Sequence, residues 1–186
     1  MSSQQLPPRA RLSLAKVCQD IFFVPNGAQR MVFEAAERPG IQKVIAACGI
    51  RAGKSTAAAV WLYARCLAPT VYPNGQPIEA FCVAPTHALA SRIFDYVVRI
   101  YQQHSPELVK SIRQVDGYLE VINLAGHPVV IRRLSAERPA SLIGFSADYL
   151  AIDEAALLDD EVFDNLMGRL IAVSYTHLTL PTILRV

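Results

Sequence analysis

The sequence predicts an α/β fold in which helices flank a mostly parallel central sheet. Short apolar runs alternate along the chain with segments whose apolar residues recur at helical spacing, the pattern of successive strand and helix units. The runs are apolar throughout, as expected for strands buried on both faces. Of the 186 residues 52% are hydrophobic, which is enough for a substantial core and excludes a disordered, fibrous or disulfide-stapled chain.

Two short helices open the chain. They are expected over residues 10–20 and 28–37, where apolar residues recur at helical spacing on either side of a turn. The apolar run Lys43–Cys48 then predicts a buried strand. It leads into Gly49–Thr56, and the alanine-rich segment 56–67 predicts the next helix. The order is therefore strand, glycine-containing loop, helix.

The same alternation continues downstream. After a turn-rich loop, Ala80–Ala84 predicts a second buried strand. The next helix runs to about Gln103 and carries an apolar stripe made of Leu89, Ile93, Val97 and Ile100. The remaining expected elements are a hairpin of residues 118–124 and 129–134, a polar loop over 135–146, a strand at Tyr149–Ile152 and a helix over 160–171.

Charge and cysteine content limit the classes of partner and compartment. The formal charge is +2, from 18 basic and 16 acidic residues, so composition gives no bulk attraction to nucleic acid or membrane. Any polyanion must meet a local patch. The four cysteines form no C-x-x-C pair and have apolar neighbours, which favours buried thiols in a reducing compartment. Without a long apolar run or a signal peptide, we expect a soluble, intracellular protein and no membrane partner.

The segment Cys48–Thr56 has the features of a phosphate-binding loop. It departs from the strict G-x-x-x-x-G-K-[ST] pattern by one residue, because Cys48 takes the first glycine position and Gly49 follows it. Between a strand and a helix, such a loop can turn its backbone N–H groups toward phosphate oxygens. For ATP, Lys54 would contact the β- and γ-phosphates and Ser55 would bind Mg²⁺. The candidate nucleotide-binding residues here are Gly49, Ile50, Arg51, Ala52, Gly53, Lys54, Ser55 and Thr56.

Asp153 and Glu154 directly follow a buried strand. Ligands gather at the carboxyl ends of parallel strands, and two carboxylates there are costly unless they are used. We expect Asp153 to hold Mg²⁺ and Glu154 to be the base that polarises the attacking water. Taken alone, the pair could be a solvated strand end and the loop a chance A-G-K-S at a helix start, but their joint occurrence in this order is much more specific.

Two further residues are candidates because of where they stand. Gln29 precedes the loop, and its amide can both accept from and donate to the N6/N7 edge of adenine. Arg51 lies inside the loop and is expected to assist catalysis at the γ-phosphate, together with Lys54 and Glu154. An exposed amide and an exposed cation are the alternatives.

These segments together resemble the ATPase motor of a tailed-phage terminase large subunit. The resemblance covers roughly residues 24–170 and rests on Gln29, the Cys48–Thr56 loop, Val83–His87, and Pro139–Gly144 leading into Tyr149–Ala156. It implies an additional-strand P-loop (RecA-like) fold and a motor that translocates double-stranded DNA into a procapsid. It also implies work as a homo-oligomeric ring in the bacterial cytoplasm, with portal protein and small terminase subunit as partners.

This chain departs from the family pattern at two places. Many relatives have an arginine before the glycine that matches Gly144, proposed to act on the neighbouring subunit's nucleotide, whereas this chain has Ile143. Arg138 is a substitute candidate. The acidic nuclease domain and the coupling motif beyond the helix at 160–171 are also absent. Without these parts, we expect the ATPase core over residues 41–172 to be incomplete. A helical, adenine-side segment is expected before it, over residues 1–40.

Residues 173–186 are expected to be a non-native tail. The run Val173–Thr182 resembles the translated transposon-end adapter of sequencing libraries. An ordinary strand with a proline stop is the alternative. If the tail is non-native, the sheet should lack the strand that follows the helix at 160–171, and the chain should be poorly soluble and nearly inactive.

Two other functions stay open on the sequence alone. One is a superfamily-2-like helicase or another P-loop ATPase, since these share the glutamine, the loop and the Asp-Glu pair. The other is a fragment that does not hydrolyse ATP. DNA contacts, if made, are expected from local arginines, and the candidates are Arg92, Arg99, Arg132 and Arg133.

Overall fold

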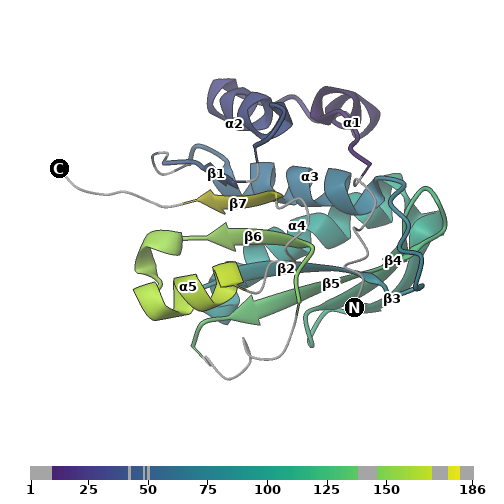
Figure 1. Ribbon diagram of the computed structural model, residues 1–186. Coiled ribbons are helices and arrows are strands. Elements are labelled where there is room, and N and C mark those ends of the chain that lie inside the picture. The colour runs from purple at the N-terminus through teal and green to yellow at the C-terminus, as the bar shows by residue number, and fades with distance from the viewer. Residues whose placement is uncertain are drawn as a thin grey trace.

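A computed structural model gives an α/β fold built on one seven-stranded sheet (Figure 1). It describes residues 10–41, 43–47, 49, 51–137, 146–168 and 176–180, the last of these as backbone. The helices are α1 (Leu14–Asp20), α2 (Gly27–Glu37), α3 (Lys54–Leu67), α4 (His87–His104) and α5 (Asp160–Gly168). The strands are β1 (Lys43–Ile45), β2 (Ile78–Ala84), β3 (Val109–Arg113), β4 (Tyr118–Ile122), β5 (Pro128–Ser135), β6 (Tyr149–Asp153) and β7 (Thr176–Leu180).

The sheet is mostly parallel, as the sequence predicts. Its order is β1-β7-β6-β2-β5-β4-β3, and the strands from β1 to β5 in this order pair in parallel. The β5-β4 and β4-β3 pairs are antiparallel. Two strands, β7 and β6, therefore lie between β1 and β2, although β1 and β2 follow each other along the chain. This arrangement brings the ends of β1 and β6 to one edge of the sheet.

The central strands β2 and β6 are buried on both faces because helices cover each side. The helices α3 and α4 pack together on one face, and α5 packs on the other (Figure 1). Alternate strand residues serve the two cores. The α3/α4 side receives Ala80, Cys82, Tyr149 and Ala151. The α5 side receives Phe81, Val83, Leu150 and Ile152, packed with Leu166.

The described part of the N-terminal segment packs on this core. Both α1 and α2 contact α3, and α2 also contacts β1. Leu14 and Ala36 are fully buried in the same cluster as the α3 residues. The domain boundaries at residues 40 and 172 stay predictions.

The structure differs from the sequence predictions at four elements. Strand β1 spans Lys43–Ile45 rather than Lys43–Cys48, and only its Val44 is buried, because β1 is an edge strand of the described sheet. Helix α3 begins at Lys54 rather than Thr56, because Gly53 adopts the left-handed conformation that caps it. Strand β3 was not predicted, since Val109–Arg113 carries polar residues on a half-exposed edge of the sheet. A non-native tail was expected to leave the sheet without a strand after α5, but Thr176–Leu180 pairs in parallel with both β1 and β6. Whether residues 173–186 are native stays a prediction.

Cys18, Cys66 and Cys82 are buried free thiols, and Cys48 lies outside the described residues. Burial raises the thiol pKa of Cys66 and of Cys82 well above its ordinary range. Among the described residues, no helix is both long enough and apolar enough to cross a bilayer.

Candidate functional site

The loop after β1 and the end of β6 meet at one edge of the sheet. The Ser55 hydroxyl donates a hydrogen bond of 2.6 Å to Oδ2 of Asp153, although 98 residues separate the two. Ser55 lies in the first turn of α3, and Asp153 is the last residue of β6. The sequence predicts that these two residues share one site, and the fold brings them into direct contact.

The loop backbone is shaped for the start of a helix. Gly53 caps α3 with φ of 76°, and Arg51 has a positive φ of 65°, which is uncommon for a residue with a side chain. The Lys54 ammonium donates to the Gly49 carbonyl at 3.3 Å. Because the first N–H groups of a helix have no partners within it, this end of α3 favours an anion. Ile50 lies outside the described residues.

Helix α2 holds the loop through a capping box that involves Asn26 and Gln29. The Asn26 side chain accepts from the Gln29 N–H at 3.0 Å, and Oε1 of Gln29 accepts from the Asn26 N–H at 2.9 Å. Each side chain also reaches the loop. Nδ2 of Asn26 donates to the Ala52 carbonyl at 3.1 Å, and Nε2 of Gln29 donates to the Gly53 carbonyl at 2.9 Å.

These contacts change the interpretation of two predicted residues. Gln29 is buried and both ends of its amide are bonded within the protein, so contact with adenine stays a prediction that requires those bonds to open. A Cβ added to Gly53 would lie 2.4 Å from Nε2 of Gln29. Position 53 thus requires glycine for two reasons, its positive φ and the close approach of the Gln29 side chain. A Cβ at Gly49 would meet nothing within 4 Å, so no steric demand for glycine exists there.

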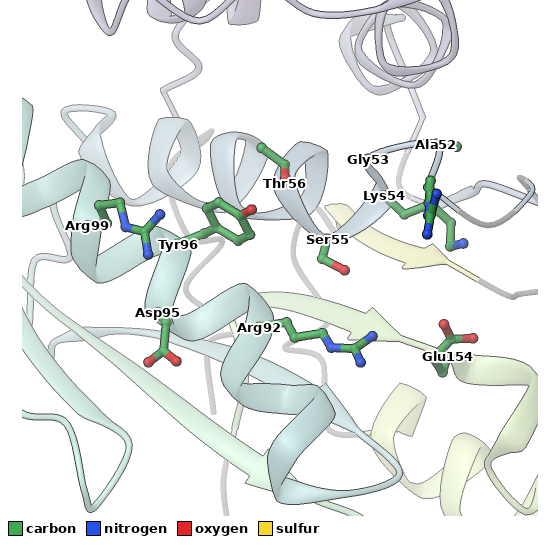
Figure 2. Close-up of a pocket in the computed structure, with 11 residues that line it drawn as sticks. Ala52, Gly53, Lys54, Ser55, Thr56, Arg92, Asp95, Tyr96, Arg99 and Glu154 are labelled. Carbon is green, nitrogen blue, oxygen red and sulfur yellow. The ribbon is translucent and has the colours of Figure 1, made fainter.

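A cavity of about 530 Å³ opens beside the loop (Figure 2). This is within the usual size range of small-molecule sites. Its walls come from the loop, from one side of α4 and from Glu154. The lining residues are Arg51, Ala52, Gly53, Lys54, Ser55, Thr56, Arg92, Asp95, Tyr96, Arg99 and Glu154.

The two carboxylates of the Asp-Glu pair have different environments. Asp153 is almost completely buried, and burial raises its pKa, while the hydrogen bond from Ser55 opposes this and the nearby Glu154 charge adds to it. Glu154 is partly exposed, has a positive φ of 52°, and its N–H donates to Oδ1 of Asp153 at 3.1 Å. The hydroxyl of Ser55 and the carboxylate of Asp153 offer the oxygen ligands that Mg²⁺ prefers, whereas Glu154 faces the cavity.

The four arginines expected to contact DNA lie in two separate places. Arg92 and Arg99 line the cavity beside the loop. Arg133 is bound within the protein, donating to Oγ of Ser91 at 2.7 Å and to the Val115 carbonyl at 2.8 Å. Arg132 is exposed, with its guanidinium 5.4 Å from the centre of the Tyr118 ring. Arg138 and the segment 139–144 lie outside the described residues.

Sequence reasoning missed Asn26 and did not predict that one side of α4 lines the cavity beside the loop. The Asn26-x-x-Gln29 pattern is itself a helix-start signal, so the capping box was open to prediction. No sequence signal indicated that one side of α4 faces the loop, because that follows from the packing of α4 against α3.

No protein-family model and no curated protein matches the sequence. Among solved structures, the Thermus phage P74-26 large terminase ATPase domain superposes with a TM-score of 0.69 at 21% identity, covering 94% of this chain and 72% of that chain. The chain has the P-loop ATPase fold of phage large terminases.

Two further structures place the terminase fold in its wider context. The large terminase of another thermophilic bacteriophage, solved in complex with ADP, has a TM-score of 0.58 at 14% identity over 92% of this chain. Dbp5 of S. cerevisiae, bound to RNA and ADP BeF3, has a TM-score of 0.60 at 15% identity over 97% of this chain. The chain spans 38% of that ADP-bound terminase and 45% of Dbp5. At these identities the likeness establishes the RecA-like fold.

Proposed function

We propose that this chain is the ATP-hydrolysing motor domain of a phage terminase large subunit, which drives double-stranded DNA into a procapsid. The observation that supports it best is the contact between Ser55, which lines the cavity, and the buried Asp153. It joins a phosphate-binding loop to the carboxyl end of a buried strand, with Glu154 beside it. That is the set of groups that nucleotide hydrolysis requires.

The triphosphate of ATP would lie against the N-terminus of α3. Backbone N–H groups of the loop bind its oxygens, and Lys54 supplies a positive charge to the β- and γ-phosphates. Arg51, on the same loop, adds a second cation at the cavity wall. Ser55 and Asp153 would hold Mg²⁺, which neutralises phosphate charge when bound.

Glu154 is the proposed general base. It borders the cavity, and its carboxylate orients a water and accepts its proton as the water oxygen bonds to the γ-phosphorus. The bond from the γ-phosphorus to the β,γ-bridging oxygen breaks, so ADP and inorganic phosphate leave. Because Asp153 is buried beside Ser55, the two carboxylates have separate tasks.

The proposed partners follow from the terminase resemblance. They are double-stranded DNA, a portal protein, a small terminase subunit, and further copies of the large subunit in a ring. The proposed place of action is the bacterial cytoplasm. The structural likeness to Dbp5 keeps a helicase-like ATPase as the second candidate.

The experiment that tests the proposal measures nucleotide binding and phosphate release by the 186-residue chain, with Mg²⁺ or with EDTA. Double-stranded DNA and single-stranded RNA are added in parallel. A terminase motor binds ATP with Mg²⁺ and responds to double-stranded DNA. Stimulation by single-stranded RNA alone favours the helicase-like candidate, and binding without phosphate release favours a fragment that does not hydrolyse ATP. A chain that binds no nucleotide contradicts all of these functions.

A further inference from the structure

One side of α4 faces the phosphate-binding loop. Arg92, Asp95, Tyr96 and Arg99 are spaced at i, i+3, i+4 and i+7, so they form a single stripe along the helix. All four line the cavity that the loop and Glu154 also border (Figure 2). The stripe is therefore the wall of the cavity opposite the loop.

The ionisable groups around this cavity favour an anion. Four cationic side chains line it, namely Arg51, Lys54, Arg92 and Arg99, against the two carboxylates of Asp95 and Glu154. The net charge of the lining side chains is therefore 4 − 2 = +2, and two of the four cations come from α4 rather than from the loop. An anion bound at the loop therefore meets positive charge from both walls.

Three members of the stripe already have contacts. Asp95 accepts a hydrogen bond of 3.2 Å from Nε2 of Gln114. The Arg99 guanidinium lies 5.4 Å from the centre of the Tyr96 ring, a cation–π contact.

Arg92 is different from the rest of the stripe. It has no hydrogen bond, ion pair or ring contact with any of the residues that the structure describes. Its side chain extends from α4 into the space between Ser55 and Glu154 (Figure 2). None of its five N–H donors is taken by a described residue, and they lie at the place where the end of a triphosphate on the loop would lie.

Resting on the proposed function, we propose that Arg92 binds the γ-phosphate of the nucleotide held by the loop, within the same chain. Lys54 reaches the phosphates from the loop, and Arg92 reaches them from α4. A guanidinium can bond two oxygens of one phosphate at once, a geometry that an ammonium does not offer. Arg92 therefore distinguishes ATP from ADP, whose terminal phosphate lies one position deeper in the loop.

The test compares the affinities of Mg·ATP-γ-S and Mg·ADP, measured by calorimetry on the full chain. Arg92→Ala should weaken ATP-γ-S binding about tenfold or more and leave ADP binding unchanged, because only the triphosphate reaches this arginine. Arg92→Lys should restore part of the affinity, since the charge returns without the two-pronged geometry.

Arg113→Ala is the matched control. Arg113 lies on β3 against the Tyr118 ring, does not line the cavity, and its loss changes the net charge equally. It should leave both affinities unchanged. If Arg92→Ala retains the wild-type ratio of the two affinities, the inference is overturned while the proposed function stands. If the unsubstituted chain binds neither nucleotide, the proposed function fails and the inference fails with it.

Discussion

Nε2 of Gln29 donates a hydrogen bond of 2.9 Å to the carbonyl oxygen of Gly53, and this bond joins α2 to the phosphate-binding loop. The neighbouring carbonyl of Ala52 is held by Asn26. In a trans peptide the N–H points opposite to the C=O. Holding these two carbonyls against α2 therefore turns the N–H groups of Gly53 and Lys54 away from α2, as anion binding requires.

Replacing Gln29 should weaken nucleotide binding by loosening the loop. Gln29→Glu keeps an oxygen for the Asn26 N–H but puts a carboxylate oxygen, which only accepts, against the Gly53 carbonyl, so the bond to the loop is replaced by repulsion. We expect the affinity for Mg·ATP to fall about tenfold, since a hydrogen bond to a part-buried group contributes roughly 1 kcal/mol or more. The measurement is calorimetric titration.

Tripolyphosphate separates the two roles considered for Gln29. If Gln29 orders the loop, tripolyphosphate and ATP lose affinity together in Gln29→Glu. A loss confined to ATP means that the amide contacts adenine, and the bond to Gly53 is then incidental.

Gly53→Ala should damage the loop more than a matched glycine substitution elsewhere. Gly53 and Gly126 have nearly the same positive φ, 76° and 75°, so alanine is equally strained at both. A Cβ at Gly126 meets nothing within 4 Å, whereas at Gly53 it meets Nε2 of Gln29 at 2.4 Å. We expect a lower melting temperature for Gly53→Ala than for Gly126→Ala, with ATP binding lost only in the former. If the two variants lose equal stability and Gly53→Ala still binds ATP, the Gln29 side chain moves away from the added Cβ at no cost.

The contrast between β6 and α4 shows what the sequence could and could not predict. β6 and the Asp-Glu pair that follows its apolar run were predictable, because a strand buried on both faces is apolar throughout and the polar residues after it mark its end. The same reasoning located Asp153, and the phosphate-loop pattern located Ser55. Arg92 was predicted as a candidate DNA contact, but the sequence does not indicate which groups its side chain faces.

Arg133 illustrates the same limit. The alternation of residues along β5 indicates a surface arginine at this position. In the structure, however, the guanidinium donates a hydrogen bond to the Val115 carbonyl in the turn before β4. Gly117, in that turn, has a positive φ of 65°, and an added Cβ would lie 2.7 Å from Cβ of Arg133. Contacts between segments that are distant in sequence decided its role, and no local pattern encodes them.

Glu154→Gln should stop turnover and preserve binding. Glutamine has nearly the same shape but cannot accept the proton of the attacking water, so kcat should fall by about 10²–10⁴ or more. Lys54→Ala should instead weaken ATP binding itself, because it removes a charge that faces the phosphates. Single-turnover phosphate release and equilibrium titration measure the two effects. Near-normal turnover in Glu154→Gln would remove Glu154 from its assigned role.

Arg133→Ala should lower stability, whereas Arg132→Ala should affect DNA binding and leave stability unchanged. Arg133 makes two side-chain hydrogen bonds to α4 and to the β3-β4 turn, so its loss should cost roughly 1–3 kcal/mol of unfolding free energy. Arg132 makes no such bond with the described residues and should leave stability unchanged. Urea denaturation compares the two variants.

If DNA meets this face of the sheet, Arg132→Ala should reduce the dependence of DNA affinity on salt by about one counterion. An unchanged salt slope would remove Arg132 from the DNA interface, and a stable Arg133→Ala would mean that its bonds to Ser91 and Val115 are not maintained in solution.

Strand β7 lies between β1, which precedes the loop, and β6, which ends in Asp153. Leu178 is in register with Val44 of β1 and with Ala151 of β6. β7 is the partner through which β1 joins the rest of the described sheet. A proline at 178 removes a backbone donor from the middle of the sheet, which is tolerated only at edges and bulges. Leu178→Pro should therefore lower the melting temperature by several degrees.

Deleting residues 173–186 should have the same effect and should also abolish ATP binding, because β1 then lacks its neighbour and the loop lacks a fixed start. Thermal unfolding and ATP titration of both variants provide the measurement. If the tail is adventitious, its deletion should have no harmful effect. The shortened chain then melts at the same temperature, binds ATP as tightly and stays at least as soluble. That result would mean that Thr176–Leu180 does not contribute to the sheet, and it would favour the adapter origin of the tail.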